Sequence, residues 1–135
     1  MHFKFRHFVI FLLFFISCSK SDPLTDKKLL IAGSKGGHKV WQLSSLTIDG
    51  QSLRLGTSQL NFQKTFYFDG TYTDSDAHDG IWKLDSPTDL LEVYYNLPTG
   101  LLFQKYSDMA VTPNLLTLNY LLDGQQVTTT YISVK

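Results

Sequence analysis

The chain has 135 residues, which is enough for one domain with its own buried core. Its 12 Lys and Arg residues balance 12 Asp and Glu residues, and the basic residues form no stripe, which excludes a nucleic-acid-binding surface. Aromatic residues make up 14% of the chain and predict a core rich in rings.

Residues 1–17 have the three parts of a secretory signal. Lys4 and Arg6 make the start positive, residues 8–16 (FVIFLLFFI) are uninterrupted apolar, and the small Ser17 precedes the only cysteine, Cys18. As a helix, the apolar run would rise only about 14 Å, which is too short to span a bilayer. We therefore interpret residues 1–17 as a signal peptide.

The stretch at residues 15–18 (FISC) resembles a bacterial lipobox. This resemblance implies a diacylglycerol on the Cys18 thiol, cleavage before Cys18 and, usually, acylation of the new amine. Two or three acyl chains anchor a protein stably, whereas one holds it only reversibly. We expect a lipoprotein of the cell envelope, held at the outer membrane through Cys18, on either its periplasmic or its surface face. An ordinary signal peptide followed by an incidental free cysteine is the alternative.

The segment that follows is polar at first. Residues 18–28 contain a proline and predict a flexible tether, although residues 24–32 could form one or two helical turns. Residues 33–37 (GSKGG) lack the GxxxxGK[ST] spacing of a phosphate loop and predict an irregular connection. We place the folded domain at residues 29–135.

From residue 39 onward, short runs rich in β-branched and aromatic residues predict about eight strands, at residues 40–48, 64–69, 71–76, 81–86, 90–97, 101–111, 115–122 and 126–134. Asp-Gly pairs between the runs predict hairpin turns, because Gly and, more weakly, Asp adopt positive φ angles; these pairs are 49–50, 69–70, 79–80 and 123–124. Strands joined in order to their neighbours predict an all-β, up-and-down antiparallel β-barrel, since closure removes exposed edges. A two-sheet β-sandwich is the alternative.

Four segments of the predicted domain carry a family resemblance. Their order and spacing resemble the small lipocalin-like lipoproteins of Bacteroidota, over roughly residues 38–132; the segments are 39–43 (KVWQL), 68–72 (FDGTY), 80–84 (GIWKL) and 115–120 (LLTLNY). The resemblance implies a lipocalin-like barrel whose cup can hold a small apolar molecule. It implies no catalytic activity.

Seven aromatic residues are the candidates for the barrel lining and for ligand binding: Trp41, Phe66, Phe68, Tyr72, Trp82, Tyr95 and Tyr120. They could fill a packed core or edge a ligand cavity. Two functions remain open. The protein is a binder or carrier of a small apolar ligand, or it is a structural subunit that docks on another envelope protein through its outer surface.

The densest polar cluster lies at residues 74–80 (DSDAHDG). Five of its residues and neighbours follow the count of a calcium loop, but Asp79 stands where such a loop needs glycine; the five are Asp74, Asp76, His78, Gly80 and Asp85. A solvated hairpin tip is the favoured interpretation. Zinc would need more ligands at suitable spacing than His38 and His78 supply. We predict no metal and no cofactor.

Catalytic motifs are missing from the sequence, which contains no GxSxG, HExxH or Gly-rich nucleotide turn. A carboxylate pair for glycoside chemistry could come from Asp85, Asp89 and Glu92. Near the starts of strands, these side chains are more typical of a solvated rim. The sequence therefore favours a protein that is not an enzyme.

Overall fold

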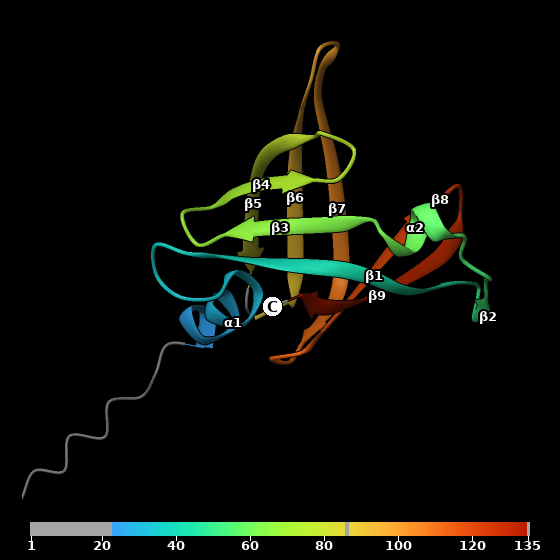
Figure 1. The fold of residues 1–135 in the computed structure, drawn as a ribbon, viewed down its shortest axis with the longest axis horizontal. Helices are drawn as coiled ribbons and strands as arrows, with labels where there is room; N and C mark the ends of the chain where they lie inside the picture. The colour runs from blue at the N-terminus through green and yellow to red at the C-terminus, as the bar shows by residue number, and fades with distance from the viewer. Residues whose placement is uncertain (1–22, 86, 135) are drawn as a thin grey trace, which may run out of the picture.

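The computed structural model describes residues 23–85 and 87–134, whose strands close into a barrel (Figure 1). The elements are, in chain order, α1 (Pro23–Ala32), β1 (His38–Ile48), β2 (Gln51–Ser52), α2 (Thr57–Leu60), β3 (Gln63–Tyr67), β4 (Thr71–Asp74), β5 (Asp79–Asp85), β6 (Leu90–Leu97), β7 (Gly100–Val111), β8 (Leu115–Leu122) and β9 (Gln125–Val134). The predicted signal peptide and Cys18 lie outside the described residues.

The barrel closes because β1 is long enough to pair along both of its edges. Residues 38–42 of β1 pair with β3, and residues 40–48 pair with β9, while β3 to β8 each pair antiparallel with the next strand. The short β2 adds a hairpin to the end of β1. In the described part of the chain, eight strands therefore form a closed, lipocalin-like barrel. The predicted all-β, up-and-down barrel is confirmed, and the β-sandwich is not what forms.

Three of the predicted Asp-Gly turns are present. At the β1–β2 turn, Asp49 and Gly50 have φ angles of 49° and 79°, and at the β8–β9 turn, Asp123 and Gly124 have φ angles of 50° and 79°. Positive φ at both central residues matches the twist of the flanking strands. The pair at residues 69–70 lies between β3 and β4, as expected.

The predicted turn at Asp79-Gly80 is wrong, because both residues belong to β5. The chain reverses before them, at residues 75–78, where Ala77 adopts a φ of 62°. Gly80 packs so closely on the next strand that a Cβ there would stand 1.8 Å from the main-chain oxygen of Tyr94. The glycine thus permits two backbones to approach rather than a turn to form.

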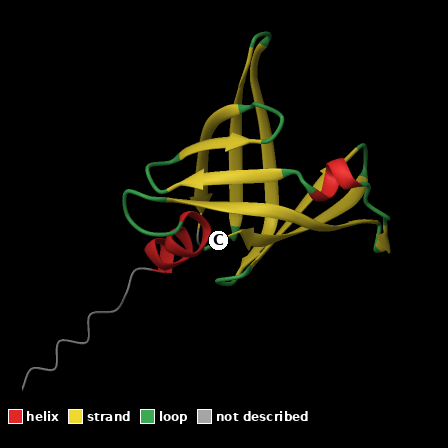
Figure 2. Cartoon of the chain, in the orientation of Figure 1, coloured by secondary structure: helices red, strands yellow, loops and turns green. Residues whose placement is uncertain are grey.

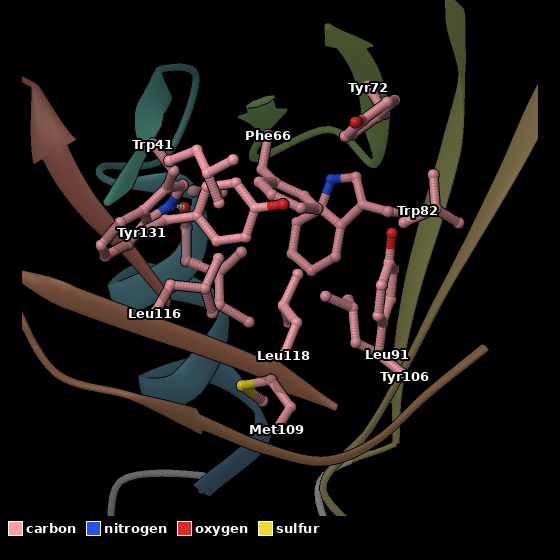
Figure 3. Packing of buried hydrophobic residues seen from close by; sticks show 14 of the residues in the cluster. Trp41, Phe66, Tyr72, Trp82, Leu91, Tyr106, Met109, Leu116, Leu118 and Tyr131 are labelled. Atoms are coloured by element: carbon pink, nitrogen blue, oxygen red, sulfur yellow. Dashed lines mark hydrogen bonds between the residues drawn. The ribbon is translucent and has the colours of Figure 1, made fainter. Parts of the chain in front are cut away.

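Side chains fill the body of the barrel (Figure 3). Residues at alternate positions of each strand point inward, so Leu91 and Val93 in β6 are both 0% exposed. Phe66 meets the rings of Tyr72 and Trp82 edge-on, with centroids 5.2 Å and 5.5 Å away. These contacts make the middle of the barrel a packed core rather than an open cup.

Helix α1 covers one end of the barrel (Figure 2). It contacts β1, β3, β5 and β7, and Ile31 is 0% exposed. The indole Nε1 of Trp41 donates a hydrogen bond to the Ile31 carbonyl oxygen at 2.8 Å, which ties the helix to β1. Because α1 begins at Pro23, it includes part of the segment 18–28 that the sequence assigns to a tether, and the expected domain boundary at residue 29 falls inside the helix.

Strands β6 and β7 extend as a long hairpin beyond the rest of the barrel (Figure 1). Residues 100–106 of β7 pair with β6, but β7 pairs with β8 only from Ser107 onward. A bulge follows Ser107, where Asp108 adopts a φ of 52°. The outer half of β7 therefore has a free edge toward β8.

Candidate functional site

A depression of about 230 Å³ opens at the end of the barrel opposite α1. The two ends of β4 show that this depression and α1 lie at opposite ends of the barrel. Gly70, just before β4, borders another depression together with Lys28 of α1, whereas Asp74, the last residue of β4, borders the depression described here. We call this depression the mouth. It is lined by Phe62, Lys64, Asp74, Asp76, His78, Tyr95, Leu102 and Gln104.

Lys64 is a buried cation at the mouth. It alternates with Phe66 on the inner face of β3 and is only 5% exposed. Its Nζ donates hydrogen bonds to the hydroxyl oxygens of Tyr72 at 2.9 Å and Tyr95 at 3.5 Å. Five ring centroids lie 5.3–6.0 Å from Nζ, those of Phe62, Tyr72, Tyr95, Tyr106 and Tyr131. Hydroxyl oxygens and ring faces replace part of the hydration that the ammonium loses on burial.

No described residue is a direct counter-ion of the ammonium. Among the described residues, no carboxylate oxygen lies within 4.0 Å of the Lys64 Nζ. Instead, the Tyr72 hydroxyl accepts from Lys64 and donates to Oδ2 of Asp74 at 3.2 Å. Tyr72 therefore links a buried cation to a carboxylate whose side chain is only 3% exposed.

Asp74 also organises the β4–β5 hairpin. Its Oδ1 accepts the backbone N–H groups of Asp76 at 3.0 Å and His78 at 3.2 Å. Its Oδ2 lies 3.2 Å from Nδ1 of His78. Both carboxylate oxygens thus have structural partners, which explains how an acidic side chain is tolerated at a buried position.

The buried hydroxyls of Tyr72, Tyr106 and Tyr131 around Lys64 stay neutral over the physiological range. Burial raises the pKa of Tyr72, Tyr106 and Tyr131 above the ordinary value of a phenol. The hydroxyl oxygens of Tyr95 and Tyr106 lie 3.4 Å apart, so they form part of the same group. The cluster offers neutral donors and acceptors beside one cation.

Alkaline pH is expected to destabilise the protein through these tyrosines. Above about pH 10 the unfolded chain releases phenolic protons, whereas folded Tyr72, Tyr106 and Tyr131 retain them because burial raises the pKa of each. The unfolded state then binds fewer protons, so the free energy of unfolding is unaffected well below pH 10 and falls above it, with a slope that rises toward about 1.4 kcal/mol per pH unit for each such tyrosine.

Urea denaturation at a series of pH values between 8 and 11 measures this slope, and the absorbance of tyrosinate at each pH reports how many phenols are ionised. The Tyr72→Phe variant is the matched control, since it removes one of the buried phenols with a raised pKa and should make the slope less steep. A free energy of unfolding that stays constant up to pH 11 would contradict the expectation.

The sequence pattern of a calcium loop does not come together in space. Asp74, Asp76 and His78 each offer one ligand atom, and these atoms lie within 4.8 Å of one another. Asp85, the expected last ligand, stands at the far end of β5, where its Oδ2 accepts a hydrogen bond from the Thr88 hydroxyl at 2.6 Å. The structure therefore gathers three of the five residues, and Asp74 already uses both of its oxygens.

The three carboxylates weighed for glycoside chemistry have separate partners. Asp85 accepts from Thr88, Asp89 pairs with Lys27 of α1, and Glu92 accepts from the Tyr94 hydroxyl at 3.2 Å. Each carboxylate stabilises a local contact, and the three do not form one cluster.

The seven predicted lining residues all belong to one aromatic and aliphatic cluster. Five are buried, namely Trp41, Phe66, Tyr72, Trp82 and Tyr95, and two are partly buried, namely Phe68 and Tyr120. Tyr95 lines the mouth. Trp82 borders the depression beside Lys28, and Tyr120 borders a third one between β7 and β8.

Sequence reasoning missed Lys64. The signal was present, because Lys64 interrupts an alternating row formed by Phe62, Phe66 and Phe68. A charged residue on the apolar face of a strand is unusual enough to mark a site. Its four tyrosine neighbours could not be found this way, since they come from β4, β6, β7 and β9.

Comparisons with known proteins add no relative: no family model, no curated protein and no solved structure matches this chain. The resemblance to lipocalin-like lipoproteins therefore stays a prediction, while the barrel itself is observed. In the described residues, neither helix is both long and apolar enough to cross a membrane.

Proposed function

We propose that this protein is a lipid-anchored lipoprotein of the cell envelope that binds a small, largely apolar molecule at the mouth and does not transform it. The observation that carries the proposal is the mouth itself. It combines the apolar side chains of Phe62 and Leu102 and the ring of Tyr95 with a set of polar groups, those of Lys64, Asp74, Asp76, His78 and Gln104. A mainly apolar hollow with a few convergent polar groups is typical of small-ligand sites.

The packed core limits where a ligand can lie. Trp41, Phe66 and Tyr72 are 0% exposed and fill the body of the barrel. A ligand therefore occupies the open end, above this core, and contacts Tyr95 rather than all seven aromatic residues. The anchor at Cys18 belongs to the proposal through the lipobox resemblance.

The neutral apolar dye N-phenyl-1-naphthylamine tests binding. We expect its fluorescence to rise saturably with one dye per protein. The Leu102→Arg variant should weaken binding at least tenfold, because the new side chain fills the mouth and places a charge in it. Leu101→Arg is the matched control. Leu101 precedes Leu102 on β7, and successive side chains of a strand point to opposite faces, so Leu101 points away from the mouth.

Equal affinity of the two variants and the unchanged protein would contradict binding at the mouth. Native mass spectrometry of protein purified from its own host should also show a co-purifying small molecule.

A second candidate function is docking on another envelope protein, and the β6–β7 hairpin favours it. Leu101 and Phe103 are 64% and 45% exposed there, on the strand with a free outer edge. Docking predicts that the effects of the two variants are reversed, so that Leu101→Arg impairs function and Leu102→Arg does not. In intact cells, Leu101→Arg would abolish cross-linking to the partner, whereas Leu102→Arg would preserve it.

A further inference from the structure

Lys64 is the buried charged group of the mouth whose donors a purely apolar ligand would leave unused. A lysine ammonium has three N–H donors. Two of them reach the hydroxyl oxygens of Tyr72 and Tyr95, the second at the long distance of 3.5 Å. The described residues supply no third acceptor and no carboxylate within 4.0 Å. Donor capacity therefore remains at a buried cation that lines a depression.

The electrostatics of the surroundings favour an anion with a single charge. The carboxylate of Asp74 reaches Nζ only through the Tyr72 hydroxyl, and both of its oxygens already have other hydrogen-bond partners. No carboxylate of the described residues contacts the ammonium directly, and the low polarity of its surroundings would strengthen an ion pair formed there. Asp76, which also lines the mouth, repels additional negative charge and so disfavours a doubly charged phosphate.

The walls of the mouth favour an apolar body attached to that anion. Phe62, just before β3, and Leu102 of β7 both line the mouth, and the Phe62 ring centroid lies 5.3 Å from the Lys64 Nζ. The volume of about 230 Å³ limits the enclosed part of the ligand to a short alkyl chain or a ring or two, and a larger apolar body would extend out of the mouth beside Leu102.

We propose that the ligand of the mouth is an amphiphilic monocarboxylate, whose carboxylate accepts a hydrogen bond from the Lys64 Nζ while its apolar body lies against Phe62 and Leu102. This inference rests on the proposed function and adds the chemical class of the ligand. Charge-assisted hydrogen bonds to a desolvated ammonium are strong, so the head group decides the affinity.

Octanoate and 1-octanol form a matched pair of probes, because they share chain length and differ in the charge of the head. Their affinities follow from displacement of N-phenyl-1-naphthylamine at pH 7. We expect octanoate to bind the unchanged protein at least tenfold more tightly than 1-octanol. The Lys64→Met variant should lose this preference through weaker octanoate binding, while its affinity for 1-octanol stays within about threefold, because methionine keeps the length and apolar character of the stem.

Two further variants complete the design. Lys64→Arg retains the charge and should retain the preference for octanoate. Lys105→Met removes an exposed lysine on the outer face of β7 and should leave both affinities unchanged. Near-ultraviolet circular dichroism checks that each variant is folded, and Lys64→Arg keeps the experiment informative if Lys64→Met does not fold.

The outcomes separate the two proposals. Equal affinities of octanoate and 1-octanol for the unchanged protein, or a preference that survives Lys64→Met, would overturn the monocarboxylate and leave the mouth a site for neutral molecules. Failure of both probes to displace the dye, or failure of the dye to bind, would overturn ligand binding at the mouth and this inference with it.

Discussion

Replacing Gly80 with alanine is expected to prevent the barrel from closing. The new Cβ would stand 1.8 Å from the main-chain oxygen of Tyr94 and 3.1 Å from the Cα of Tyr95, on the strand with which Gly80 pairs. Both obstacles are backbone atoms, so no side-chain rotation relieves the clash. We expect a loss of at least about 4 kcal/mol in the free energy of unfolding, which is a large share of the stability of a domain this size.

Urea denaturation monitored by tryptophan fluorescence measures this loss. Gly56→Ala is the matched control, because a Cβ there would meet nothing closer than the Gln59 Oε1 at 3.7 Å and its φ of −78° suits any residue. The control should change the free energy of unfolding by less than about 1 kcal/mol. A Gly80→Ala protein as stable as this control would show that β5 and β6 do not approach as described.

Replacing Cys18 with alanine is expected to release the protein from membranes. On the proposal that Cys18 carries the anchor, the variant has no thiol to receive a diacylglycerol. The acyl chain on the α-amine of residue 18 is then lost as well, because it is added only after the thiol is lipidated. Each buried methylene of an acyl chain contributes about 0.8 kcal/mol, so loss of the chains removes essentially all membrane affinity. Radioactive fatty acid should label the unchanged protein and not the variant.

Ser17→Ala is the matched control, because it keeps a small residue before the cleavage point. It should remain labelled and sediment with membranes after a carbonate wash. A Cys18→Ala protein that still sediments with membranes would contradict the proposed anchor and would show that another part of the protein binds the membrane.

The strands could be predicted because their signals are local. Alternation of apolar residues depends only on the pleat, and residues 90–97 and 115–122 became β6 and β8 with the expected bounds. The Asp79-Gly80 pair misled the prediction because its composition is that of a turn, while the demand for glycine comes from Tyr94 on another strand. The short β2 and α2 carry too few residues for a periodic signal.

The site could be predicted only in part. The inward faces of the strands identified Tyr72 and Tyr95, but whether rings fill a core or edge a cavity depends on how side chains from many strands meet. Lys64 was visible as a charge in an apolar row, yet its environment of tyrosine hydroxyls is built by residues distant in the chain. Long-range pairing, rather than any local pattern, makes the mouth.

The position of α1 sets the direction in which the barrel would face. Helix α1 begins at Pro23 and covers the end opposite the mouth. Five peptide units join Cys18 to Pro23, and whatever their conformation they reach at most about 18 Å. Under the proposed anchoring, the barrel stands on its helical end close to the lipid headgroups and its opening points into the aqueous compartment. The ligand would then enter and leave the mouth from the aqueous phase or from another protein, and not directly from the bilayer.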